Sequence, residues 1–257
     1  MPQRPRWLAA TRPGREPFAE ADLGVLVRNG SFVTAPGIFE SLPYDPLAAF
    51  APIANVAALP LAYSVHPSVP AVTPAELLTL LKANPDKYNY GTPGIGTLHH
   101  LSAELIKKQT GIRMTHIPYK GAAPALIDLI GGQIGLAVTS STAALAQAAS
   151  GKLRVIGLTS RERIPGFPNV ATMSEGLPGF VATNDLFLLA PAGTPAVTIS
   201  RLSAALKTVL SRTDLADAFV AQGAIVEWTS AEEIASRITR DISRWRSLAK
   251  EGSIRAQ

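Results

Sequence analysis

A glycine-rich segment, residues 91–97, carries the strongest chemical signal in the sequence. Its residues read Gly-Thr-Pro-Gly-Ile-Gly-Thr and lie between a predicted strand and a predicted helix. Glycines allow backbone N–H groups to turn towards a ligand, and a helix N-terminus adds partial positive charge. The segment is therefore predicted to hold a carboxylate or a phosphate, with a plain strand-to-helix turn as the alternative. The residues proposed to contact the ligand are Gly91, Thr92, Gly94, Gly96 and Thr97.

The segment does not match the common nucleotide-binding motifs. No Gly-Lys-Ser/Thr follows it, so it is not a P-loop. Gly94 and Gly96 are followed by Thr-Leu-His99, where a dinucleotide fingerprint needs a third glycine. No cofactor is predicted from it.

Three nearby titratable residues suggest a metal site, but the pattern is incomplete. His100 and Glu104 lie one helical turn apart beside His99, yet the second histidine of a His-Glu-x-x-His motif is missing. We therefore expect packed or solvated side chains and no metal. His116 is expected to be a structural histidine.

No catalytic constellation can be assigned either. There is no Gly-x-Ser-x-Gly elbow for a nucleophilic serine. The carboxylates of Asp128, Glu175 and Asp185 are expected to be solvated, as is a charged face formed by Arg237 and its neighbouring arginines. Trp245 follows Ile238 and Ile242 at helical spacing and is predicted to lie in the core.

Composition excludes several classes of protein. The chain has 257 residues, a net charge of +5, 6% aromatic residues and no cysteine. Without cysteine there are no disulfides, thiolate metal sites or cysteine nucleophiles. Lysine and arginine are spread along the chain and do not alternate with aromatics, so we expect no nucleic-acid partner.

Neither a membrane span nor a signal peptide is predicted. The most apolar stretch, residues 50–65, is short and is broken by Pro52 and Pro60. Residues 1–15 contain four arginines and an apolar patch of four residues, far less than the apolar region of a signal peptide. Taken alone, this predicts a cytoplasmic chain. Residues 1–20 are expected to form a poorly ordered arm.

Predicted strands and helices alternate with short connections, which is typical of an α/β protein with a mainly parallel, doubly wound sheet. Turns are expected at Pro36-Gly37 and over residues 43–46, and Thr194 is expected to cap a helix. Strands are predicted at 23–27, 50–56, 59–65, 88–90, 114–117, 133–138, 153–158 and 187–190, and helices at 74–83, 98–109, 124–130, 143–149, 195–210 and from 231 onward.

A set of short strings stands in the order found in one family. They are Leu42-Pro-Tyr-Asp-Pro46, Asn89-Tyr-Gly91, His116-Ile-Pro-Tyr-Lys-Gly121, Gly131-Gly-Gln133, Gly151-Lys-Leu-Arg154, Gly176-Leu-Pro-Gly179 and Ala190-Pro-Ala-Gly-Thr-Pro195. The ordered set resembles the Bug/TctC family, the substrate-binding proteins of tripartite tricarboxylate transporters. The resemblance covers about residues 22–254.

The resemblance implies a type II periplasmic-binding-protein fold in which two lobes close around a small organic carboxylate. Lobe 1 would comprise residues 1–60 and 186–257, and lobe 2 residues 61–185, with hinges near 61–65 and 183–188. It also implies a periplasmic location, membrane transporter subunits as partners, no enzymatic activity and no cofactor.

The resemblance also implies ligand-binding residues. Residues 29–31 would form one wall of the cleft and residues 91–97 the opposite wall, above a floor at the end of a strand. The residues carried over are Asn29, Gly30, Ser31, Thr139, Ser140 and, on the return crossover, Asn184.

Three departures from the family pattern bear on these expectations. The family's signal peptide and first strand–helix unit have no counterpart before Asp22, so lobe 1 is expected to be incomplete and to dimerise or lose stability through an open strand edge. Thr139 and Gly135 stand where aspartates are frequent, and a tryptophan is replaced near Asp185. The alternatives are a truncated fragment that binds no ligand and an enzyme that holds a phosphate or acyl group at residues 91–97.

Overall fold

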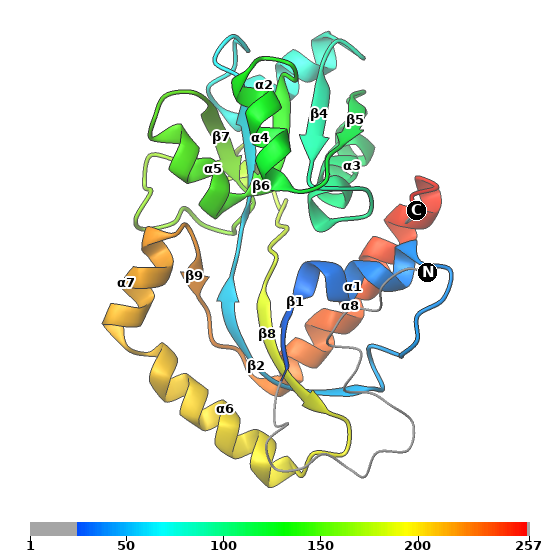
Figure 1. Ribbon diagram of the computed structural model, residues 1–257, viewed down its shortest axis with the longest axis vertical. Helices are drawn as coiled ribbons and strands as arrows, with labels where there is room; N and C mark the ends of the chain where they lie inside the picture. Colours follow the sequence, from blue (N-terminus) through cyan, green and yellow to red (C-terminus); the bar gives the residue numbers. More distant parts are fainter. Residues whose placement is uncertain (1–24, 256–257) are drawn as a thin grey trace.

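Two β-sheets organise the chain, one in the upper and one in the lower half of Figure 1. This computed structural model describes residues 25–255, and of residues 25–28 it describes the backbone. The arm expected at residues 1–20 lies outside this range, as does the start of the strand expected at 23–27. Each sheet with its helices forms one lobe of an α/β fold.

The five-stranded sheet of lobe 2 has the order β5-β4-β6-β3-β7. Strand β4 pairs in parallel with β5 and β6, whereas β3 runs antiparallel to β6 and β7. The prediction of a mainly parallel sheet is therefore wrong for β3, because this strand enters from the other lobe. The elements of lobe 2 are β3 (Leu61–Val65), α2 (Pro74–Ala83), β4 (Asn89–Thr92), α3 (Leu98–Thr110), β5 (Thr115–Pro118), α4 (Ala122–Ile130), β6 (Leu136–Ser140), α5 (Ser141–Ala148), β7 (Arg154–Leu158) and the 3₁₀ turn η2 (Met173–Glu175).

The four-stranded sheet of lobe 1 has the order β1-β8-β2-β9, and each neighbouring pair is antiparallel, so the prediction of mainly parallel pairing is wrong for this sheet too. Side chains that alternate along β8 meet different helices: Leu189 packs in the cluster of α8, and Ala190 in the cluster of α6. The elements of lobe 1 are β1 (Val25–Arg28), α1 (Asn29–Ile38), β2 (Phe50–Ala58), β8 (Leu186–Pro191), α6 (Ala196–Leu210), α7 (Thr213–Ala221), β9 (Ile225–Val226) and α8 (Ala231–Glu251).

Two crossover segments join the lobes and are bonded to each other. Pro60 and Thr183 form an antiparallel bridge, and the Asn184 N–H donates to the Leu59 carbonyl at 2.8 Å. The Thr159 hydroxyl donates to the Ala182 carbonyl at 2.5 Å and accepts the Leu61 N–H at 2.8 Å. The crossovers therefore form one short ribbon between the sheets.

Capping residues mark the helix boundaries in three places. The Thr73 hydroxyl accepts the Glu76 N–H at the start of α2, and the Ser230 hydroxyl accepts the Glu233 N–H at the start of α8. Helix α3 ends at Gly111, whose φ of 72° is left-handed. Trp245 is buried, as predicted from its helical spacing.

Other local predictions are wrong. The turn expected at Pro36-Gly37 lies inside α1, where Gly37 allows α8 to approach: a Cβ there would lie 2.8 Å from the Arg246 Cα. Thr194 does not cap α6, since its hydroxyl donates to the Pro191 carbonyl. Helix α7 was not predicted. None of its residues is fully buried.

The main hydrophobic core extends through both lobes. It includes Leu101 and Tyr63 in lobe 2 and Phe187 and Ile234 in lobe 1, all almost completely buried. Within residues 25–255, no helix combines the length and apolarity that a membrane span requires.

Candidate ligand-binding site

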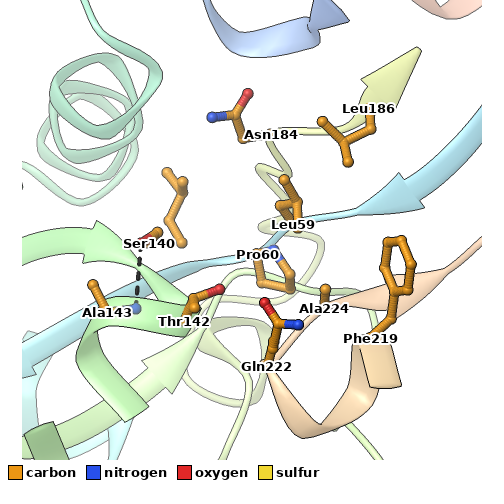
Figure 2. A pocket seen from close by; sticks show the side chains of 11 residues that line it. Leu59, Pro60, Ser140, Thr142, Ala143, Asn184, Leu186, Phe219, Gln222 and Ala224 are labelled. Carbon is orange, nitrogen blue, oxygen red and sulfur yellow. Dashed lines mark hydrogen bonds between the residues drawn. The ribbon is translucent and has the colours of Figure 1, made fainter. Parts of the chain in front are cut away.

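A pocket of about 400 Å³ lies where the two lobes meet (Figure 2). We call it the interlobe pocket. Lobe 2 contributes the junction of β6 and α5, and lobe 1 contributes the start of β8 and the segment around the end of α7. Its lining residues are Leu59, Pro60, Leu61, Ser140, Thr142, Ala143, Asn184, Leu186, Phe219, Gln222 and Ala224.

The lining combines neutral polar groups with an apolar surface. Ser140, Thr142, Asn184 and Gln222 supply hydroxyl and amide groups, and none of the eleven lining residues is charged. The Ser140 hydroxyl accepts the Ala143 N–H at 3.4 Å and caps α5, so the positive end of the helix dipole lies at the pocket. This chemistry suits a carboxylate attached to a short aliphatic body.

Asn184 connects the pocket to the start of α1. Its Oδ1 accepts the Gly30 N–H at 2.9 Å, and the neighbouring Asn29 N–H donates to the Asp185 carbonyl at 2.7 Å. A Cβ at Gly30 would lie 2.7 Å from this Oδ1 and 3.2 Å from the Leu98 Cβ, so α1 also touches the start of α3. The structure thus brings Asn29, Gly30 and Asn184 together, while Ser31 is exposed.

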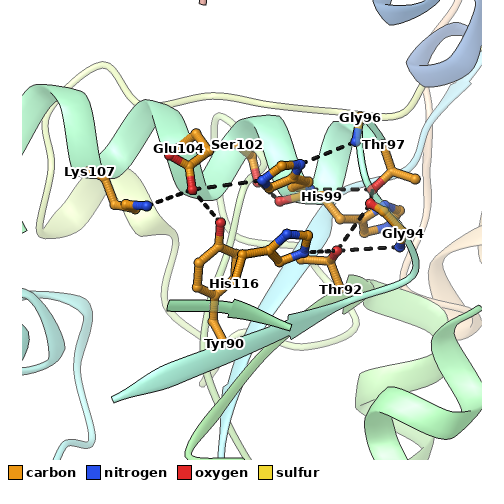
Figure 3. A network of polar contacts seen from close by, with 11 residues as sticks. Tyr90, Thr92, Gly94, Gly96, Thr97, His99, Ser102, Glu104, Lys107 and His116 are labelled. Carbon is orange, nitrogen blue, oxygen red and sulfur yellow. Dashed lines mark hydrogen bonds and ion pairs between the residues drawn. The ribbon is translucent and has the colours of Figure 1, made fainter. Parts of the chain in front are cut away.

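The loop after β4 uses most of its polar groups internally (Figure 3). Thr92 is completely buried, and its hydroxyl accepts the Gly94 N–H at 3.3 Å. The Gly96 N–H donates to His100 Nδ1 at 3.2 Å. The Thr97 hydroxyl donates to the Gly94 carbonyl and caps α3. These N–H and hydroxyl groups, which the sequence assigned to a ligand, therefore hold the loop in shape.

The two glycines flanking this network meet different neighbours. Gly91 lies within β4, where a Cβ would be 2.6 Å from Ile134 Cδ1, so its role is close packing. Gly96 has a left-handed φ of 72°, and a Cβ there would be 2.6 Å from Ile38 Cδ1. The loop therefore packs directly on α1 of lobe 1.

Thr139 and Ser140, the two residues predicted for the floor of the cleft, lie in different environments. Ser140 lines the interlobe pocket. Thr139 is completely buried beside it in β6, and its hydroxyl has no hydrogen-bond partner among the residues that the structure describes. Phe219 and Gln222 were missed because α7 was not predicted. The Gly223 carbonyl accepts the Ser141 hydroxyl at 2.7 Å, which attaches the end of α7 to α5.

A histidine pair lies beneath the loop. The rings of His100 and His116 stack with their centroids 3.8 Å apart, and burial lowers the pKa of each to about 4. Glu104 accepts hydrogen bonds from Tyr90 Oη at 2.5 Å and Lys107 Nζ at 2.7 Å. Within the described range, no group of three or more metal-ligating side chains is present.

Asp185 and Arg237 form an ion pair beside the crossovers, with the carboxylate buried and the guanidinium partly exposed. The Asp185 side chain is completely buried and lies 2.6 Å from Arg237 Nη2, while Arg237 Nη1 lies 3.6 Å from Glu227. Arg237 Nη2 also donates to the Thr183 hydroxyl at 3.1 Å. Burial raises the pKa of Asp185 to about 7, although Arg237 opposes the shift. The expectation of a solvated side chain is therefore wrong for Asp185, while Arg237 is partly exposed and bonded.

Comparison with known proteins gives consistent results. The model for the tripartite tricarboxylate transporter family receptor, TctC, matches residues 22–254. Protein BugT of Bordetella pertussis is 32% identical over 215 residues, which are 83% of this chain and 66% of BugT.

Two solved structures are similar in fold and sequence. One is R. palustris Rpa4515 with adipate, with a TM-score of 0.77 and 28% identity over 90% of this chain and 78% of that chain. The other is MatC from Rhodopseudomonas palustris with bound malate, with a TM-score of 0.71 and 27% identity over 88% of this chain and 78% of that chain.

The family match covers both lobes and the pocket between them. The alternative of an enzyme that holds a phosphate or acyl group is excluded by the family, whose members are substrate-binding proteins of the periplasm. The chain belongs to the TctC family of tripartite tricarboxylate transporter receptors and is a solute-binding protein with a type II periplasmic-binding-protein fold.

Proposed function

We propose that the chain captures a small dicarboxylate or related organic acid in the interlobe pocket, outside the cytoplasm, and delivers it to the membrane subunits of a tripartite transporter. The observation that carries the proposal is the chemistry of the pocket: a capped helix N-terminus and four neutral polar side chains surround an apolar interior. Adipate and malate in the two similar structures support this class of ligand.

Binding would use both parts of the lining. One carboxylate accepts hydrogen bonds at the start of α5 from the hydroxyl and the backbone N–H of Thr142, because the Ser141 and Ala143 N–H groups already donate to the Pro60 carbonyl and the Ser140 hydroxyl. Such charge-assisted bonds are short and strong. The aliphatic body of the acid contacts Leu59, Leu186 and Phe219. A pocket of about 400 Å³ is within the range of small-ligand sites.

Closure of the pocket would be a hinge motion at the crossovers. Strand β2 ends at Ala58 and β3 begins at Leu61 in the other sheet, while β8 begins at Leu186 after the return segment. We therefore keep the lobes proposed from the sequence, residues 1–60 with 186–257 and residues 61–185, and place the bending points at 59–60 and 183–185.

Thermal unfolding against a panel of adipate, malate, succinate and citrate tests this proposal. An acid at one hundred times its dissociation constant should stabilise the folded chain by about 2.7 kcal/mol, a shift of roughly 5–10 °C. Thr142→Val removes a hydroxyl at the start of α5 and should weaken binding about tenfold.

The matched control is Thr79→Val on the exposed face of α2, which should leave the shift unchanged. A cooperative melt that no acid shifts would contradict the proposal and favour a fragment without a ligand.

We also propose that the chain dimerises through the open edge of lobe 1. Among the described strands, β1 pairs with β8 and with no other, so its second edge offers free backbone groups. Gel filtration of the purified chain should give the volume of a dimer. A stable, compact monomer would contradict this prediction.

A further inference from the structure

The loop at residues 94–97 is held from below by two histidines on different elements. His100, in the first turn of α3, accepts the Gly96 N–H at its Nδ1. His116, on β5, contacts the Thr92 hydroxyl through its Nε2 at 2.7 Å. That hydroxyl in turn accepts the Gly94 N–H. Figure 3 shows His116 beside Thr92 and Gly94, and the His100 and His116 rings stack on each other.

Each contact uses one particular ring nitrogen. An N–H donor requires an unprotonated Nδ1 in His100, which places the proton of this ring on Nε2, at 3.8 Å from Glu104 Oε1. In His116 the nitrogen that contacts the Thr92 hydroxyl is Nε2, whereas in His100 the nitrogen that accepts the hydrogen bond is Nδ1. Burial keeps the pKa of both rings at about 4, so both are neutral at pH 7 and His100 can accept.

The loop that these histidines hold is also the contact between lobe 2 and α1. Gly96 packs against Ile38, and Leu98 packs against Gly30. The Gly30 N–H is bonded to Asn184, which lines the interlobe pocket. A change in the loop would therefore move the start of α1 and the amide of Asn184.

We propose that His100 and His116 are positioning residues for ligand binding: they hold the loop at residues 94–97 in the shape that packs on α1 and keeps the Asn184 amide in place at the interlobe pocket. Neither ring touches the ligand. The proposal rests on the proposed function, because it assigns these residues to the same pocket.

Reciprocal amide substitutions test it. The Asn side chain places its amide close to the position of Nδ1, and the Gln side chain reaches the position of Nε2. His100→Asn and His116→Gln therefore keep the bonded position, whereas His100→Gln and His116→Asn do not. All four variants lose the stacked ring. The variant that keeps the bonded position is the smaller one at residue 100 and the larger one at residue 116, so a difference in side-chain size alone cannot produce the expected pattern.

At pH 7, His100→Gln and His116→Asn are expected to weaken binding of the stabilising acid about tenfold, and the other two variants less than about threefold. Calorimetric titration measures these constants. If both members of each pair bind equally well, or if binding follows the unfolding temperature alone, the histidines are structural and the positioning role is overturned.

Nuclear magnetic resonance of the ligand-free chain separates this result from a failure of the proposed function. The ¹⁵N shifts should show His100 as the Nε2–H tautomer at pH 7, and the Gly96 amide resonance should move in His100→Gln but stay near its position in His100→Asn. An Nδ1–H tautomer would overturn the proposal even if acids bind. If the wild-type chain binds no acid while the tautomer is as expected, the proposed function fails and the assignment of the histidines to binding fails with it, and their contact with the loop stands.

Discussion

Replacing Arg237 with Met is expected to lower the free energy of unfolding by about 3–5 kcal/mol at pH 8. The substitution leaves the Asp185 carboxylate completely buried with its 2.6 Å ionic partner removed. Methionine retains much of the volume of the arginine stem, so the loss reports on the charge and its hydrogen bonds more than on a cavity.

The loss should depend on pH with a definite sign. The pKa of Asp185 is about 7 in the folded chain and lies near its ordinary value of 3.8 in the unfolded chain, so the folded state binds more protons between these pH values. The stability contributed by this carboxyl therefore falls as the pH rises from about 4 to 7. Without Arg237 the folded pKa rises further, so the fall continues above pH 7 and the variant differs from wild type more at pH 8 than at pH 5.

Urea unfolding at the two pH values measures this difference. Arg240→Met on the exposed face of the same helix is the control and should change stability by less than about 0.5 kcal/mol. Adding Asp185→Asn to Arg237→Met should recover most of the loss at pH 8. A loss that is equal at pH 5 and pH 8 would mean that the pair does not carry the effect.

Gly96→Ala is expected to lower the free energy of unfolding by about 2–4 kcal/mol. A left-handed φ costs a residue with a Cβ about 1–2 kcal/mol, and overpacking adds about 1–2 kcal/mol because the new Cβ would lie 2.6 Å from Ile38 Cδ1. The same substitution should weaken ligand binding, since the loop is pushed away from α1.

Gly111→Ala separates the two costs. Gly111 has the same φ of 72°, but nothing lies within 4 Å of the position of its Cβ. It should lose only the conformational part, about 1–2 kcal/mol. Ile38→Val removes Cδ1 and should recover part of the loss in the double variant with Gly96→Ala. If both alanine variants lose the same free energy of unfolding, the Ile38 side chain moves aside without a cost in stability.

Local patterns predicted most elements because their signals are local. Thr73 with Glu76 and Ser230 with Glu233 mark helix starts, and Gly111 marks a helix end, each through a bond or a dihedral angle within a few residues. The antiparallel direction of β3 has no such signal, since it depends on how the chain passes between two sheets. Gly37 resembles a turn residue, yet it is needed for the approach of α8, which follows more than 190 residues later.

The site was predictable to a smaller extent. The resemblance to the family pointed to Ser140 and Asn184, and both line the interlobe pocket. The hydroxyls of Thr92 and Thr97 were assigned to a ligand because the sequence does not show that His116, His100 and Gly94 occupy them. Asp185 was interpreted as solvated because the partner that makes its burial tolerable, Arg237, lies 52 positions away and was itself assigned to a solvated face.

The bonded crossovers also restrict how the molecule can move. Pro60 faces Thr183 across a bridge, and Thr159 bonds to Leu61 and Ala182 on both sides, so neither connection can twist without the other. The two crossover segments therefore bend together about one axis and resist torsion. An open form confined to a single bending coordinate samples few orientations of its lobes, so little configurational entropy is lost when a bound acid arrests that motion.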